Sequence, residues 1–194
     1  MNTKSVNRLI FVDNSNVWIE GQRVSAVHRK MSKSISEAME RNIFDPAWRM
    51  DFGMLLSLTS GYNRGSVKRA VLFGSKPPDT DTIWDAARDS GFEVTAMNRV
   101  HGREKKIDTG ITTEMVAAPM SMGLDPTRDE FTLVAGDRDF VPPVKQLVDW
   151  GFVVNVYFWE HAAAELKLTG TTFKSLNRDL SRLTLGRNGP QHRH

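Results

Sequence analysis

Residues 132–143, TLVAGDRDFVPP, contain an apolar run, a turn and the start of a helix. The apolar run stops at Gly136, and Asp137 and Asp139 follow with one residue between them. Ligands of open parallel α/β sheets bind at the carboxyl ends of strands, so acids directly after a strand are candidates for a site. The alternative is structural, because Asp139 is placed to cap a helix that begins at Phe140.

Other short apolar runs suggest that this strand belongs to a parallel sheet. Together with 131–135, they are residues 8–12 (RLIFV), 70–73 (AVLF), 92–96 (FEVTA) and 152–158 (FVVNVYF). Several are nearly continuous, which is typical of strands buried on both faces. Helical segments lie between them, and those at 81–89 and 143–150 precede Gly91 and Gly151, which can adopt the left-handed conformation that ends a helix. The alternation predicts an α/β layered domain with right-handed crossovers.

The size and composition favour one globular domain. The chain has 194 residues, of which 40% are hydrophobic and 25% charged. We expect a single domain over residues 1–186, an insertion or lid at 21–42, which is polar and basic, and a disordered tail at 187–194. The absence of cysteine excludes disulfides and thiolate metal sites. The N-terminus has no long apolar run, so we expect no membrane span and a cytoplasmic location.

Acidic residues follow two of the expected strands. Asp13 follows the first strand as Asp137 and Asp139 follow the fourth, and Asp108 begins a helix. If these two strands are neighbours, the acids converge, and a hard cation such as Mg²⁺ or Mn²⁺ relieves their repulsion. Each acid alone has a structural alternative, an Asx turn for Asp13 and a helix cap for Asp108. Glu114, six residues after Asp108, lies on another helix face and is interpreted as solvated or ion-paired.

Basic residues gather in two segments. One is 167–194, and the other, 99–106, contains Arg99, Arg103, Lys105 and Lys106 against one acid. Such stripes suit a polyanion, although solvated basic faces have the same composition.

The segments VDNSNV (12–17), KKID (105–108) and AGDRDF (135–140) resemble, in order and spacing, three motifs of the NYN family, relatives of the PIN-domain nucleases. The chain also resembles LabA-like bacterial proteins, and the resemblance covers residues 9–158. It implies a PIN-like three-layer α/β/α sandwich with a mostly parallel sheet of about five strands in the order 3-2-1-4-5. It also implies divalent-metal-dependent cleavage of RNA, with a metal site formed by Asp13, Asp108, Asp137 and Asp139, and with Asn16 orienting a ligand or the backbone.

The resemblance has departures and leaves alternatives open. Ala135 replaces a serine or threonine, Asn14 replaces a glycine, and Arg138 stands between the two acids. We expect a Mg²⁺- or Mn²⁺-dependent ribonuclease acting on single-stranded RNA. A catalytically silent RNA- or protein-binding module with the same fold is the alternative, and a homodimer is one assembly that the sequence allows. The expected RNA contacts are Arg99, Arg103, Lys105, Lys106, Arg138 and, by base stacking, Trp18, for which core packing is the alternative.

Overall fold

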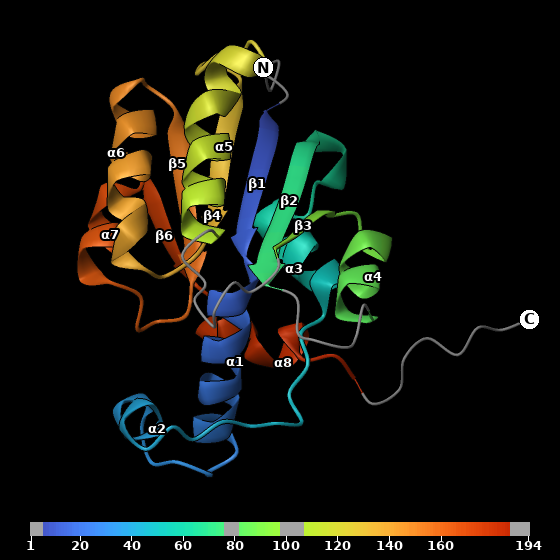
Figure 1. Ribbon diagram of the computed structural model, residues 1–194, viewed down its shortest axis with the longest axis vertical. Helices are drawn as coiled ribbons and strands as arrows, with labels where there is room; N and C mark the ends of the chain where they lie inside the picture. Colours follow the sequence, from blue (N-terminus) through green and yellow to red (C-terminus); the bar gives the residue numbers. More distant parts are fainter. Residues whose placement is uncertain (1–5, 76–81, 98–106, 187–194) are drawn as a thin grey trace, which may run out of the picture.

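The structure, a computed structural model, describes residues 6–75, 82–97 and 107–186. Within these residues, six parallel strands form one sheet in the order β3-β2-β1-β4-β5-β6 (Figure 1). The strands are β1 (Asn7–Asp13), β2 (Val67–Ser75), β3 (Glu93–Met97), β4 (Asp129–Val134), β5 (Val153–Phe158) and β6 (Thr172–Ser175). The expected order 3-2-1-4-5 is confirmed. The edge strand β6 was not expected, because its four residues, TFKS, carry one apolar side chain and no buried one.

Helices cover both faces of the sheet (Figure 1). On one face, α1, α3, α4 and α8 share a hydrophobic cluster with Ile10 and Val12 of β1, and on the other, α5, α6 and α7 share a cluster with Leu9 and Phe11. The expected three-layer α/β/α sandwich is therefore confirmed. No helix in the described ranges is long and apolar enough to cross a membrane. The helices described are α1 (Asn14–His28), α2 (Ile35–Glu40), α3 (Phe52–Thr59), α4 (Thr82–Asp89), α5 (Ile107–Ser121), α6 (Val141–Asp149), α7 (Ala164–Thr169) and α8 (Leu180–Leu183), with short 3-10 helices η1 (Arg64–Ser66), η2 (Arg138–Phe140) and η3 (Leu176–Asp179).

The glycines expected to end two helices do so. Gly91 after α4 has φ of 106°, and Gly151 after α6 has φ of 88°. In both turns the next residue, Phe92 or Phe152, donates its N–H back to a carbonyl of the helix, at 3.1 and 3.0 Å. This bond satisfies a carbonyl that the helix end would otherwise leave unpaired. The same device thus leads from each helix into the next strand.

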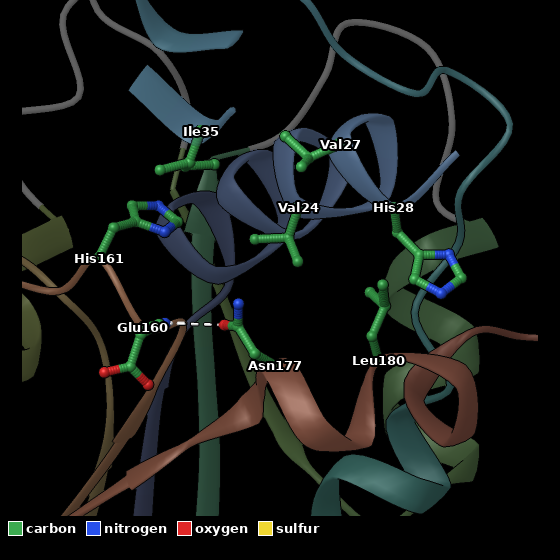
Figure 2. Close-up of a pocket in the computed structure, with 8 residues that line it drawn as sticks. All are labelled: Val24, Val27, His28, Ile35, Glu160, His161, Asn177 and Leu180. Carbon is green, nitrogen blue, oxygen red and sulfur yellow. Dashed lines mark hydrogen bonds between the residues drawn. The ribbon is translucent and has the colours of Figure 1, made fainter. Parts of the chain in front are cut away.

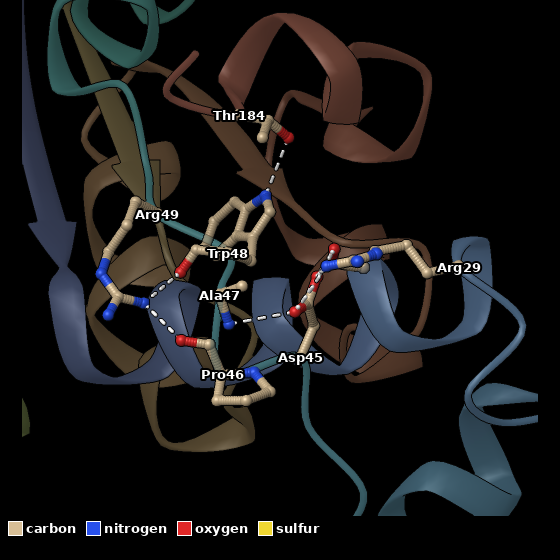
Figure 3. A network of polar contacts seen from close by, with 8 residues as sticks. Arg29, Asp45, Pro46, Ala47, Trp48, Arg49 and Thr184 are labelled. Carbon is tan, nitrogen blue, oxygen red and sulfur yellow. Dashed lines mark hydrogen bonds and ion pairs between the residues drawn. The ribbon is translucent and has the colours of Figure 1, made fainter. Parts of the chain in front are cut away.

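Residues 21–28, the first part of the expected insertion, are the C-terminal half of α1, where Val24 and Ala26 are buried. The chain then passes through α2 and returns to α1 at Asp45. The Asp45 carboxylate accepts hydrogen bonds from Ser25 at 2.6 Å and from Arg29 at 3.1 Å, and the nearby Trp48 indole donates to Thr184 after α8 at 2.9 Å (Figure 3). These contacts hold the chain at Asp45 and Trp48 against α1 and the end of α8. That the residues between α1 and Asp45 move as a lid remains a prediction.

Asp129, at the start of β4, is a charged residue that folding buries to 2% exposure. Its carboxylate accepts hydrogen bonds from the Asp125 N–H at 2.7 Å and the Asn7 amide at 2.8 Å, and Lys68 lies 3.8 Å away. Burial disfavours the charge, but these donors and the nearby cations outweigh it, so the pKa of Asp129 is lowered. The charged carboxylate therefore stabilises the fold.

We expect acid to weaken the fold partly through Asp129. A lowered pKa in the folded state gives stability that is present above the unfolded pKa, about 4, and is lost as the pH falls through the folded pKa. The free energy of unfolding, from urea titrations between about pH 6 and 3, should fall less steeply with acid in Asp129→Asn. Equal slopes for wild type and Asp129→Asn would contradict the assignment.

Candidate acidic site at the carboxyl edge of the sheet

Asp13 lies where β1 passes directly into α1. Its side chain is 4% exposed, and its Oδ1 accepts the Asn16 backbone N–H at 3.1 Å. It is thus the N-cap of α1, and the cap satisfies one of the unpaired N–H groups of the first turn. This bond fixes a carboxylate at the carboxyl end of a central strand.

Asp137 has the same role after the neighbouring strand β4. Its Oδ1 accepts the Asp139 N–H at 3.1 Å, so it caps the short helix η2. The alternative in which Asp139 is the cap is therefore wrong. The chain forms a 3-10 turn before α6, and this moves the capping position to Asp137. Asp137 and Asp139 are both exposed.

Asn16 and Gly136 join the two strand ends. The Asn16 Oδ1 accepts the Gly136 N–H at 3.0 Å, so this side chain orients the backbone that leads to Asp137. A Cβ at Gly136 would lie 2.1 Å from ring carbons of Phe158 on β5. The close approach explains why this position has no side chain.

The convergence expected for the acids takes the form of a shared cavity. Asp13, Asp108 and Asp137 line a cavity of about 490 Å³, with Asp108 placed in the first turn of α5, at its second residue. Asp108 is therefore inside the helix and is not its N-cap. Asp139 is not among the residues that line the cavity.

Two further charged residues, Glu20 and Arg23, line the same cavity and were missed from the sequence. They follow Asn16 at four and seven residues, the spacing that places side chains on one face of a helix. This spacing was a signal that could have identified them. It was missed because Arg23 lies in residues 21–42, the segment interpreted as an insertion, and was therefore not considered together with the first motif.

Glu20 and Arg23 form a mostly buried polar group with His161. Their side chains are 12% and 16% exposed, and the Arg23 guanidinium pairs with one Glu20 oxygen. The other Glu20 oxygen lies 2.7 Å from Nε2 of His161, in the loop after β5. Arg23 also lies over the Phe44 ring, 4.8 Å from its centroid, and its Nε is buried without a hydrogen-bond partner. The wall of an acidic cavity thus contains a cation that its surroundings hold in place.

The carboxylates fit a hydrated divalent cation in chemistry. They line one cavity, and Mg²⁺ commonly binds through one or two carboxylates while it keeps several waters. Among the described residues, however, no three Asp, Glu, His or Cys side chains are grouped closely enough to hold an ion together. The observed arrangement therefore suits an ion held in part through water.

The remaining expected contacts lie elsewhere. Arg138 is exposed and pairs with Glu165 of α7 at 2.8 Å, and Glu114 pairs with Arg69 at 2.9 Å. Trp18 is half-buried and stacks on Phe52 with the ring centroids 6.0 Å apart, as the core-packing alternative describes. Four expected RNA contacts lie outside the described residues, namely Arg99, Arg103, Lys105 and Lys106.

Comparisons with known proteins identify the family of the chain. The family model of the NYN domain matches residues 9–177. The chain belongs to the NYN domain family. This NYN domain is thereby a member of the PIN-like nuclease superfamily. A crystal structure of a protein of unknown function from Vibrio parahaemolyticus superimposes with a TM-score of 0.66 at 19% identity, covering 95% of this chain and 99% of that one. At this identity it supports the fold alone, and no curated protein matches the chain significantly.

Proposed function

We propose that this NYN domain is a divalent-metal-dependent ribonuclease that hydrolyses single-stranded RNA, with Mg²⁺ or Mn²⁺ as the cofactor. The observation that carries the proposal is the cavity that Asp13, Asp108 and Asp137 share. Asp13 ends β1, and Asp137 follows the neighbouring strand β4. Carboxylates so placed in a parallel sheet suit a metal-assisted reaction at a phosphate. The family membership supports nuclease chemistry in general.

In this proposal Asp13, Asp108 and Asp137 hold the ion, directly or through water. When bound, such an ion lowers the pKa of a water molecule and neutralises charge that develops on the phosphate. The caps of α1 and η2 keep Asp13 and Asp137 in place, and the bond from Gly136 to Asn16 holds the two turns together. Asp139, outside the cavity lining, has at most a supporting role.

The direct test is degradation of a single-stranded RNA by the purified protein with Mn²⁺. Cleavage should require the ion and stop when EDTA is added. Cleavage that persists in EDTA would contradict the proposal.

A second candidate function is a binding module that keeps the fold without cutting. The specific observation in its favour is that the described carboxylates do not form a three-ligand group. Salt-sensitive binding of RNA without cleavage in Mg²⁺ or Mn²⁺ would support it over the ribonuclease.

Arg23 is the basic side chain among the described residues that line the acidic cavity, and we expect its partly exposed guanidinium to contact an RNA phosphate. Replacing Arg23 by Gln should weaken binding of single-stranded RNA, measured by fluorescence anisotropy in EDTA so that cleavage does not interfere. The slope of log K against log salt should become smaller by about 0.7, the value for one phosphate contact on a single strand.

The matched control is Arg88→Gln. Arg88 pairs with an acid three residues before it, as Arg23 does, but lies on α4 and does not line the cavity. Its slope should equal that of the wild type. An unchanged slope in Arg23→Gln would show that Arg23 has a structural role alone.

A further inference from the structure

A second cavity, of about 410 Å³, is lined by His161, the partner of Glu20. It is an open pocket lined by residues of the C-terminal half of α1, α2, the loop after β5 and the η3–α8 segment (Figure 2). Its apolar wall consists of Val24, Val27, Ile35 and Leu180. The volume is within the range of about 300–1,000 Å³ that is usual for small-molecule sites.

The lining restricts the chemistry of an occupant. Branched aliphatic side chains from three helices face the space, so the body of a ligand must be apolar. Two exposed polar side chains also line the cavity, the His28 imidazole and the Glu160 carboxylate, which pairs with Lys167 at 3.4 Å. Among the described residues that line the cavity there is no Lys or Arg to balance a bound anion, so a charged ligand is disfavoured. Asn177 accepts the Glu160 N–H at 2.8 Å, and its amide nitrogen is turned toward Val24 (Figure 2). A neutral molecule with one hydrogen-bonding end fits these groups.

His161 lines this cavity and also contacts Glu20, a residue of the acidic cavity. Its ring lines the apolar space, while its Nε2 lies 2.7 Å from Glu20. Glu20 and Arg23 line the acidic cavity. A molecule that moves the imidazole therefore changes the contact that holds Glu20, and with it the position of Arg23.

We propose that this second cavity is a regulatory site for a neutral, mainly apolar small molecule with one polar end, linked to the acidic cavity through His161 and Glu20. The link concerns the arrangement of the charged wall. It does not depend on which reaction, if any, the acidic cavity performs.

The test uses NMR of the full chain with labelled Ile, Leu and Val methyl groups, and indole as the probe. Indole should cause saturable shifts at Val24, Val27, Ile35 and Leu180, and a parallel shift of the Arg23 Nε–H signal. Val27→Phe fills the cavity and should abolish the saturable shifts. Met31→Phe is the matched control, because Met31 is exposed and does not line the cavity. If Val27→Phe does not fold, as judged from its methyl spectrum, Ile35→Phe replaces it.

The variant His161→Leu separates binding from the link. It keeps the wall apolar and removes the bond to Glu20, so indole should still shift the methyl signals but not that of Arg23. Absent saturable shifts, or shifts that survive filling of the cavity, would overturn the site. Methyl shifts in the wild type without a change at Arg23 would overturn the link.

Discussion

Replacing Asp13 by Asn should abolish Mn²⁺-dependent cleavage of single-stranded RNA and leave the melting temperature nearly unchanged. Asparagine caps a helix about as well as aspartate, so the bond to the Asn16 N–H can be kept while the negative charge is lost. Loss of outer partners of a metal site costs about 10–100-fold in activity, and we expect a larger loss for a residue that holds the ion. Initial rates on a labelled RNA and thermal melts measure the two effects.

Asp51→Asn is the matched control. Asp51 caps α3 with the same geometry, accepting the Met54 N–H at 2.8 Å, and it does not line the acidic cavity. Both variants should melt alike, and Asp51→Asn should retain full activity. Wild-type activity in Asp13→Asn would contradict the proposed role of this carboxylate, and equal losses in both variants would assign the effect to capping.

Replacing Gly136 by Ala should be among the most destabilising changes of one methyl group in the chain. The added Cβ would lie 2.1 Å from the buried Phe158 ring, far inside the separation of about 3.5–4.0 Å that carbon atoms prefer. Overpacking of this kind costs about 1–3 kcal/mol, and we expect the upper end because a ring and a strand end must both move. Urea unfolding gives the change in free energy of unfolding, and cleavage assays should show a parallel loss because the turn carries Asp137.

Two variants make this prediction specific. Gly65→Ala should be nearly neutral, since its Cβ would meet Asn63 at an ordinary 3.5 Å. In a Phe158→Leu background, Gly136→Ala should cost less than in the wild type, because the smaller side chain leaves room. Equal costs in both backgrounds would mean that contact with Phe158 is not the reason for the glycine.

The central strands could be predicted because burial on both faces leaves a nearly continuous apolar run, as in residues 8–12. The edge strand β6 has no such signal, since one of its sides has no neighbouring strand and its side chains are exposed or half-buried. The ends of α4 and α6 were predicted correctly from Gly91 and Gly151, because the turn after each helix requires a positive φ. The prediction that Asp139 caps the helix was wrong. The same local sequence is compatible with a helix that begins directly at Phe140 and with a 3-10 turn before the helix, and the structure has the turn.

The acids at the carboxyl edge could be inferred because sheet order brings the ends of β1 and β4 together. The partners of the charged side chains could not be inferred from the sequence. Arg138 pairs with Glu165, and Glu20 contacts His161, and the segments in contact are far apart in the chain, so no local pattern predicts these pairs. The position of Arg23 in the cavity wall could not be predicted for a similar reason. It depends on α1 continuing to His28, through a segment that was interpreted as an insertion.

The bond between Asn16 and Gly136 has a consequence for how the site assembles. It joins two turns that are 120 positions apart in the chain, each at the end of a central strand. The Gly136 amide is shielded from exchange with solvent deuterium when both turns are docked, and it is released when either one opens. A single amide proton can therefore report whether the two halves of the site are joined, and comparison with the exchange of strand amides would separate local opening from global unfolding.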